Sequence, residues 1–304
     1  MADFPEPTDF IANYTRGHDA ALELWVVDER PPAALSPRGI VRRIRQILRG
    51  DGQGLRDNND SEAERDWAAM KTGWGQTTPQ QFETYLRSKF DHDLQRRFEY
   101  PFQVRCLTAP GVCVGVVVDM GGGNSYSTVV PIVLGLRDSR TISVDVVNHT
   151  AVSKYGIEYV WGDCMNTTLP AECADVVTII STLEHVGLGR WGDPLDVDGD
   201  IKAMREARRI LRPGGHVVLT VPYGYPTVVF NLHRIYDQGR INKLSEGFEM
   251  VREEYTLDGA IAARDDIEGQ KIRPGIPSST RRKLPDASAP QVAGGGMFFL
   301  RKTN

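Results

Sequence analysis

The stretch VVVDMGGGN at residues 116–124 decides the fold of this chain. Its β-branched run predicts a buried strand, and Asp119 stands near the end of that strand. Gly121 and Gly123 follow with the spacing Asp-x-Gly-x-Gly, and Asn124 comes next. Glycines let the backbone turn tightly and approach a ligand closely. The turn has neither the dinucleotide pattern G-x-G-x-x-G nor the Gly-Lys-Ser/Thr of a phosphate loop, so it favours a nucleoside ligand without a polyphosphate.

More strand-like runs follow the glycine turn, and residues 125–136 can form the helix between the first two. The runs are residues 141–145, 155–160, 175–181 and 216–222. The first of them ends in Asp145, which is spaced like the acid that holds ribose in nucleotide-binding folds. Asp163 and Cys164 follow the second run, and Asp163 could accept a hydrogen bond from an adenine amino group. The alternation of strands and helices predicts an α/β protein.

The order of these motifs, completed by the Leu-x-Pro-Gly-Gly turn at residues 211–215, resembles class I S-adenosylmethionine-dependent methyltransferases. The resemblance covers residues 105–256, and residues 297–301 would form the last strand. It implies a doubly wound, mainly parallel seven-stranded sheet with an antiparallel last strand. It also implies S-adenosylmethionine as the cofactor. The residues expected to bind it are Asp119, Gly121, Gly123, Asn124, Asp145, Asp163, Cys164 and Ser181.

The chemistry is expected directly after the fourth strand, where Glu184 and His185 follow Ser181. An imidazole takes up a proton near neutral pH, so His185 is a candidate general base that Glu184 would orient. A second interpretation is a metal site. Glu184 and His185 resemble part of the Glu-x-x-Glu-His pattern of metal-dependent O-methyltransferases, with His233 as a later ligand for Mg²⁺ or Mn²⁺. Ser181 replaces the first Glu of that pattern, and a merely structural His185 is the third interpretation.

The segment after His185 contains Arg190 and Trp191, followed by four aspartates at positions 193–200. The acids precede a helical pattern, where carboxylates are favoured by capping and by the helix dipole; a metal loop is the alternative. Residues 184–194 (EHVGLGRWGDP), together with residues 231–236 (NLHRIY), resemble segments of bacterial methyltransferases from sugar and polysaccharide pathways, in which Trp191 would stack on a sugar ring and Arg190 and Asp193 would bind its hydroxyls. The predicted acceptor is therefore a hydroxyl of a sugar or oligosaccharide. A phenolic or other small metabolite is the alternative, as is a module that binds the cofactor without catalysis.

Residues 1–100 are predicted to form a helical cover, and residues 101–304 the catalytic domain with a polar insertion at 258–296. Helices are expected at residues 36–50 and from Thr78 to a stop at Pro101. Trp67 and Trp74 are candidates for a lid over the site. The polar stretches at 51–64 and 265–296 are expected to be mobile.

Composition agrees with a globular enzyme. The chain has 304 residues, of which 40% are hydrophobic and 25% are charged. A net charge of −4 argues against a nucleic-acid partner, which usually meets a basic surface. No apolar run reaches the ~18 residues of a membrane span, and the first residues do not follow a signal-peptide pattern. The four cysteines form no metal-type pair and fit reduced thiols. These features predict a cytoplasmic protein, and the resemblance to methyltransferases implies a small-molecule or oligosaccharide acceptor as its partner.

Overall fold

The computed structural model describes residues 23–26, 78–122, 130, 139–146, 156–189, 193–230, 233–268 and 294–304. Its centre is an eight-stranded sheet with the strand order β10-β9-β11-β6-β5-β2-β3-β4. The strands are β2 (Val116–Met120), β3 (Arg140–Asp145), β4 (Glu158–Trp161), β5 (Ala174–Ile180), β6 (Leu211–Pro222), β9 (Phe248–Leu257), β10 (Ala260–Ala262) and β11 (Gly294–Lys302).

The sheet confirms the predicted doubly wound α/β fold. Strands β2 to β6 pair in parallel, and their spatial order is third, second, first, fourth and fifth, as in doubly wound sheets. Strand β11 lies between β6 and β9 and is antiparallel to both, which confirms the antiparallel last strand. The short strand β10 pairs with β9 at the edge and adds an eighth strand to the seven predicted.

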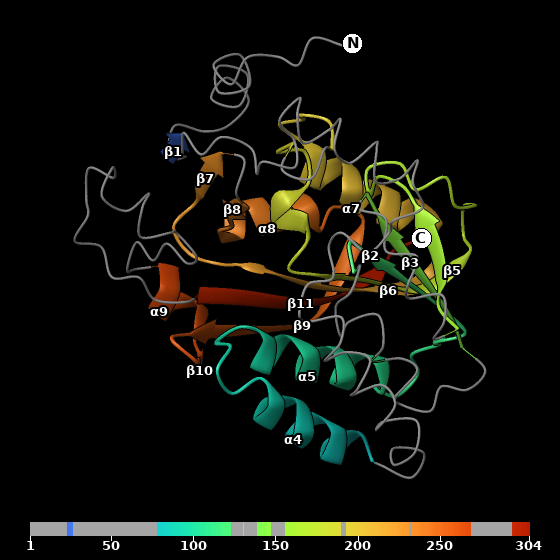
Figure 1. Ribbon diagram of the computed structural model, residues 1–304, viewed down its shortest axis with the longest axis horizontal. Coiled ribbons are helices and arrows are strands. Elements are labelled where there is room, and N and C mark those ends of the chain that lie inside the picture. The colour runs from blue at the N-terminus through green and yellow to red at the C-terminus, as the bar shows by residue number, and fades with distance from the viewer. Residues whose placement is uncertain are drawn as a thin grey trace, which may run out of the picture.

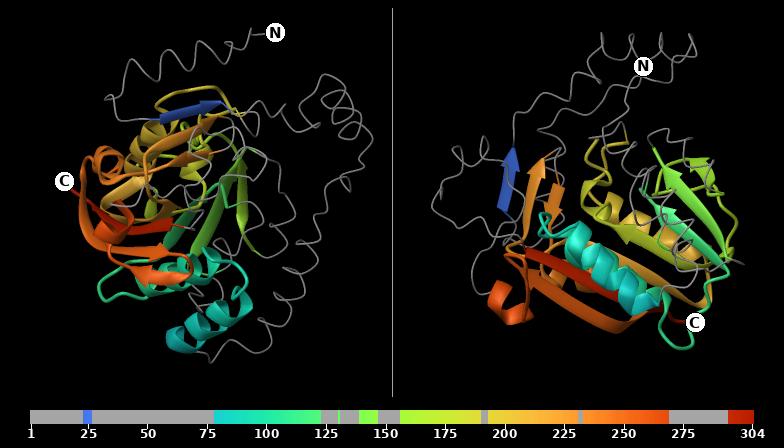
Figure 2. Two further views of the ribbon diagram at one scale, coloured as in Figure 1. Left: turned by 90° about the vertical axis from the view of Figure 1, so that its left-hand side faces the viewer. Right: turned by 60° about the horizontal axis from the view of Figure 1, so that its bottom comes forward.

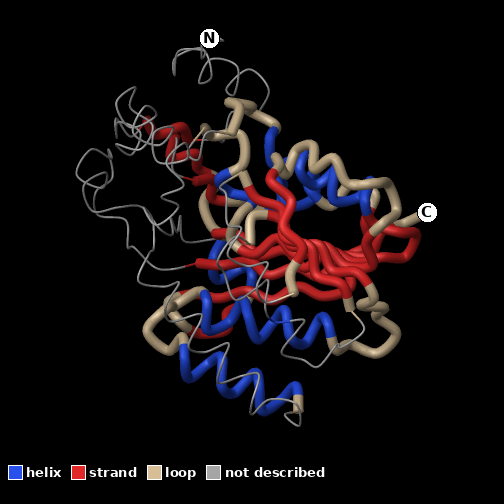
Figure 3. The backbone as a smooth tube through the Cα atoms, turned by 45° about the vertical axis from the view of Figure 1, so that its right-hand side comes forward, coloured by secondary structure: helices blue, strands red, loops and turns tan. Residues whose placement is uncertain are grey.

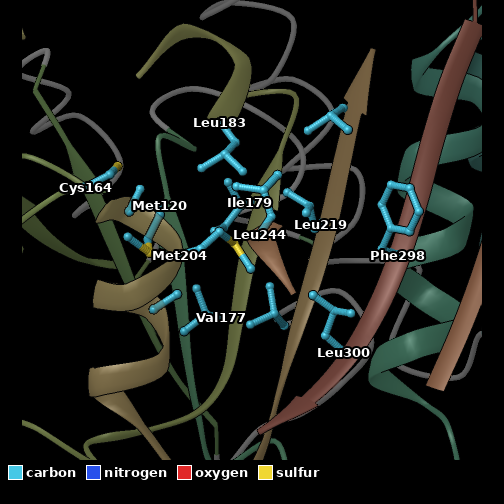
Figure 4. Packing of buried hydrophobic residues seen from close by; sticks show 14 of the residues in the cluster. Met120, Cys164, Val177, Ile179, Leu183, Met204, Leu219, Leu244, Phe298 and Leu300 are labelled. Carbon is cyan, nitrogen blue, oxygen red and sulfur yellow. The ribbon is translucent and has the colours of Figure 1, made fainter. Parts of the chain in front are cut away.

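Helices cover both faces of this sheet (Figures 1 and 3). Helices α4 (Pro79–Lys89) and α5 (Arg96–Leu107) lie on one side, and α7 (Gly199–Ile210) and α8 (Gln238–Leu244) lie on the other. Alternate residues of each strand face opposite cores, since a strand has a side-chain period of two. In β5, Val177 and Ile179 pack with Met204 of α7 (Figure 4), whereas Val176 and Ile180 pack in the α4–α5 core.

The predicted helix start at Thr78 is confirmed by a complete capping box between Thr78 and Gln81. The predicted stop at Pro101 is wrong, because Pro101 lies inside α5. The break comes earlier, where Asp93 Oδ1 accepts hydrogen bonds from the amides of Gln95 and Arg96 at 2.9 Å and starts a new helix. A side-chain acceptor for the first free amides thus decided the boundary.

A second, three-stranded sheet of β1 (Glu23–Val26), β7 (Thr227–Phe230) and β8 (His233–Ile235) lies beyond the end of β6. Strand β1 pairs in parallel with β7, which brings an N-terminal segment against a hairpin that follows β6 (Figure 2). The sequence analysis expected only helices in this part of the chain. A four-residue strand has too little periodicity to be recognised without its partner.

Several predictions fall outside the described residues. They are the helices at 36–50 and 125–136 (except Val130), the polar stretch at 51–64, Trp67, Trp74 and residues 269–293 of the insertion. The described part of the insertion contains β10 and helix α9 (Arg264–Glu268). The division proposed at residue 100 falls within α5, which packs directly on the sheet. None of the helices in the described ranges is long and apolar enough to cross a membrane.

Candidate functional site

The predicted site residues meet at one edge of the central sheet. Gly121, Asp145, Asp163 and Ser181 stand at or just after the carboxyl ends of β2, β3, β4 and β5, which run in parallel. Open α/β sheets bind their ligands at this edge. The backbone joins the first two ends directly, since the Gly121 amide donates a hydrogen bond to the Val144 carbonyl at 2.7 Å.

The carboxylates assigned to the nucleoside lie around Cys164. Burial raises the pKa of the Cys164 thiol, and the nearby charges of Asp145 and Asp163 raise it further. Burial also raises the pKa of Asp163, whose Oδ1 accepts a hydrogen bond from the Met165 amide at 2.8 Å. Cys164 is therefore a neutral, buried thiol within electrostatic reach of both carboxylates. Carboxylates in this arrangement can accept from ribose hydroxyls and from an adenine amino group.

Two other residues predicted to bind the cofactor, Asp119 and Ser181, use side-chain oxygens in hydrogen bonds within the protein. Asp119 is fully buried, and its Oδ1 accepts a hydrogen bond from Thr178 Oγ1 at 2.7 Å. Ser181 Oγ donates to Glu99 Oε1 at 2.5 Å. Both side chains thus hold strand ends together, in addition to any contact with a ligand. Gly123 and Asn124 lie outside the described residues.

Gly121 packs closely against Thr182, in the segment that follows β5. Its φ of +78° lies in the left-handed region, and a Cβ built there would stand 2.0 Å from Thr182 Cγ2. Thr182 Oγ1 in turn donates to the Gly121 carbonyl at 3.3 Å. The glycine is therefore required both by the backbone conformation and by the segment after β5.

Gly121→Ala is expected to destabilise the fold and to weaken nucleoside binding by at least tenfold, because the new methyl group would push the β2 and β5 exits apart. Gly156→Ala is the matched control: Gly156 has a φ of +80°, but a Cβ there would meet nothing within 4 Å. The control should cost only the ~1–3 kcal/mol of a left-handed non-glycine residue. Thermal unfolding and calorimetry with S-adenosylhomocysteine measure both effects. Equal losses in the two variants would refute the close-approach explanation.

Glu184 and His185 form a single turn, η3 (Leu183–His185), immediately after this exit. His185 Nε2 lies 3.8 Å from Glu184 Oε1. The His185 side chain is 24% exposed and that of Glu184 is 4% exposed, so a partly accessible imidazole lies beside a buried carboxylate. His233 of β8 is buried, and its ring lies edge-on to His185 with the centroids 6.4 Å apart. The structure therefore brings together all three residues that the sequence analysis selected.

These three side chains do not form a metal site as they stand. In the described ranges, no group of three His, Cys, Asp or Glu side chains is arranged to hold a metal ion. The pair of His185 and Glu184 is arranged as an imidazole with a neighbouring carboxylate. We therefore assign no step to a metal.

The aspartates after His185 lead into the start of α7, as predicted, with Asp198 at the N-cap position and Asp200 in the first turn, but the predicted side-chain cap is not formed. Helix α7 begins after Asp198, which makes no side-chain capping hydrogen bond. Asp193 Oδ2 instead accepts from the amides of Gly187 and Gly189 at 2.8 and 3.2 Å. Asp200 is fully buried, and its carboxylate accepts hydrogen bonds from both Nε and Nη2 of Arg240, a residue of another helix. Arg190 and Trp191 lie outside the described residues.

Arg234 holds the two ends of this loop. It is 1% exposed, and it donates to the carbonyls of Val186 at 2.6 Å and of Asp196 at 3.3 Å. Its Nε lies 3.9 Å from Asp200 Oδ2. His233 was predicted to lie near the site. The role of Arg234 in fixing the backbone next to His185 was not predicted.

Arg96 and Glu99 of α5 were not among the predicted site residues. Glu99 is 5% exposed, and its Oε2 accepts from Arg96 Nη1 at 2.6 Å. Burial lowers the pKa of Arg96, but Glu99, Tyr100 and Glu184 raise it by more, so that the net shift is upward. Arg96 therefore lies within electrostatic reach of the Glu184–His185 turn. The signal in the sequence was weak, since Arg and Glu three residues apart are common on exposed helix faces.

A family model described as "Caenorhabditis protein of unknown function, DUF268" matches residues 164–277. This is less than half of the chain, and the description assigns no activity. No curated protein matches the chain.

Solved structures with a similar backbone include several methyltransferases. N-methyltransferase NodS from Bradyrhizobium japonicum, in complex with S-adenosylhomocysteine, is 14% identical with a TM-score of 0.47, over 82% of this chain and 100% of that one. The 1,6-didemethyltoxoflavin-N1-methyltransferase of Burkholderia thailandensis is 15% identical with a TM-score of 0.44, over 75% and 92%. The [4+2]-cyclase SpnF is also similar, at 15% identity and a TM-score of 0.43, over 68% and 82%. The fold assignment rests on the strand order, because one fold hosts many reactions.

Proposed function

We propose that the protein is an S-adenosylmethionine-dependent methyltransferase that acts on a hydroxyl group. The observation that carries this proposal is the arrangement at one sheet edge. Asp145 and Asp163 stand at or just after the ends of the paired strands β3 and β4, and the η3 turn with Glu184 and His185 follows β5 at the same edge. The cofactor, when bound, supplies an electrophilic methyl group on a sulfonium.

The nucleoside end of the cofactor fits the donor and acceptor chemistry present. Asp145 would accept from the ribose hydroxyls, and Asp163 would accept from the adenine amino group. The cofactor's positive sulfonium also suits an edge where acidic side chains gather, because opposite charges attract more strongly in a partly buried site.

His185 would take the proton from the acceptor hydroxyl. The carboxylate of Glu184, 3.8 Å from Nε2, stabilises the imidazolium that forms. A general base of this kind typically adds ~10²–10⁴-fold to the rate. Holding the hydroxyl in line with the methyl group lowers the activation barrier further, by up to ~7–11 kcal/mol.

Within this reaction class we propose a sugar or oligosaccharide as the acceptor. Its support is the Arg190–Trp191 pair in the sequence. Asp193, which belongs to the same segment, uses its Oδ2 inside its own loop. A panel of sugars, phenols and amines with labelled S-adenosylmethionine tests the assignment. Methylation confined to phenols or amines would refute the sugar, and cofactor binding without turnover on any acceptor would indicate a binding module.

Asp145→Ala is expected to weaken S-adenosylhomocysteine binding by at least tenfold, since it removes the predicted acceptor for two ribose hydroxyls. Glu158→Ala is the control. Glu158 also belongs to the β3–β4 pair but lies at the opposite end of β4, in an exposed ion pair with Arg140. Calorimetry on both variants decides the assignment, and unchanged binding by Asp145→Ala would contradict it.

A further inference from the structure

Ser181 adopts a backbone conformation that its residue type disfavours. It follows β5 directly and has a φ of +45°, in the left-handed region. Non-glycine residues persist there only when the surrounding structure holds them. The next residues are Thr182 and the η3 turn that carries the candidate base, so the path of the chain at Ser181 determines where His185 lies.

The carboxylate of Glu99 holds Ser181 by a hydrogen bond to its hydroxyl. Its Oε1 accepts from Ser181 Oγ at 2.5 Å and from Thr220 Oγ1 at 2.9 Å. The Ser181 amide donates to the Thr220 carbonyl at 3.0 Å, which fixes the same residue from the backbone. Glu99 Oε2 accepts from Arg96, so the carboxylate is held by donors on both oxygens. One buried carboxylate thus connects α5 with the exits of β5 and β6.

The turn after Ser181 is closed by local backbone hydrogen bonds, and beyond it Arg234 binds the Val186 carbonyl. The His185 amide donates to the Thr182 carbonyl at 2.9 Å, which closes one turn of helix. A turn of this length follows the direction in which the chain leaves the strand. The direction is set by the left-handed residue and by the packing of Thr182 against Gly121.

We propose that Glu99 is a positioning residue: it holds Ser181 in the left-handed conformation and thereby orients Glu184 and His185 for the reaction. The proposal rests on the proposed function of this site. It differs from the expectation that Ser181 contacts the cofactor, since it assigns the Ser181 hydroxyl to Glu99.

Two substitutions at Ser181 separate these roles. Ser181→Ala and Ser181→Gly both remove the hydroxyl, but only glycine adopts a positive φ without strain. If Glu99 acts by holding the backbone, Ser181→Gly should turn over about tenfold faster than Ser181→Ala. Both should bind S-adenosylhomocysteine equally. Equal turnover in the two variants, or an equal loss of affinity in both, would overturn the proposal.

The carboxylate is tested by Glu99→Ala alone and combined with Ser181→Gly. Glu99→Ala should lose turnover by about tenfold or more, and the added glycine should restore a large part of it. A double variant no better than Glu99→Ala would overturn the proposal. Glu83→Gln is the matched control, because Glu83 of α4 binds Arg105 of α5 at 2.8 Å, away from the β5 exit. It should turn over like the wild type.

A measurement that does not depend on methyl transfer can test the role of Glu99 even if the proposed function is wrong. The carbon-bound protons of the His185 ring can be followed by NMR and assigned by their loss in His185→Gln. They should shift in Ser181→Ala and return toward the wild-type position in Ser181→Gly. If the wild type methylates no acceptor, the proposed function fails while this shift still decides the role of Glu99. Identical His185 signals in the two variants would then overturn it.

Discussion

His185→Ala is expected to lose ~10²-fold or more in turnover, with little change in S-adenosylhomocysteine affinity. The imidazole lies 3.8 Å from the buried carboxylate of Glu184 and is itself 24% exposed, so it can meet both an acceptor and the group that stabilises its charged form. It contributes nothing to the proposed contacts with ribose or adenine. The loss should therefore appear in kcat and not in cofactor binding.

His92→Ala is the control for this variant. His92 also lies beside an acidic residue, Asp91 at 3.7 Å, but both side chains are exposed on the segment between α4 and α5. It should retain wild-type turnover. Near-normal turnover of His185→Ala would reject a base at this position and leave positioning as the source of the rate.

A chelator separates the base from the metal interpretation. If His185 acts as a base, a chelator should leave turnover unchanged, in keeping with the described side chains, which form no three-ligand group. If turnover is instead abolished and restored by Mg²⁺ or Mn²⁺, a metal takes part and this mechanism is wrong. His233→Ala should then raise the metal concentration required.

Asp200→Ala is expected to lower the free energy of unfolding by about 3–5 kcal/mol, because it leaves buried guanidinium groups without their carboxylate. Asp200 is fully buried and bound twice by Arg240, and Arg234 lies 3.9 Å away. Arg234 also fixes the Val186 carbonyl next to His185, so the variant should lose turnover as well. Denaturant unfolding measures the first effect.

Asp198→Ala is the matched control for Asp200→Ala. Asp198 lies 3.9 Å from the same Arg240, but its side chain is 48% exposed. Its removal should cost less than ~1 kcal/mol, as for other exposed ion pairs. Similar losses in the two variants would show that burial of the pair does not determine its contribution.

The Asp200 carboxylate should also make the stabilisation of the fold depend on pH. Burial raises the pKa of Asp200, but Arg234 and Arg240 lower it by more, so the net shift is downward. A lowered pKa means that the stabilisation is complete above the unfolded value of ~3.9 and is lost as the pH falls through the lower folded value. The stability difference between the wild type and Asp200→Ala should therefore be constant near neutrality and shrink below about pH 4. A difference that grows in acid would contradict this assignment.

The sequence by itself determined the order of the central strands and the residues at their carboxyl ends. Buried parallel strands are continuous apolar runs, so these strands could be recognised without the fold, although β4 begins later than predicted and the turn predicted at residues 211–215 lies inside β6. The glycine turn after β2 and the acid that ends β3 follow from the same local pattern. Because parallel strands present their ends at one edge, the neighbourhood of Asp145, Asp163 and His185 was predictable.

Tertiary structure alone decided which polar side chains hold that edge together. Glu99 and Ser181 are 82 positions apart in the sequence, and Arg240 and Asp200 are 40 positions apart. Pairs of this kind leave no periodic signal, since charged residues at helix surfaces look alike in sequence whether they face solvent or a buried partner. The same reason explains why the aspartates lie at the start of α7, as predicted, but bind partners that the sequence did not indicate. Capping is a local preference, and burial next to two arginines outweighed it at Asp200.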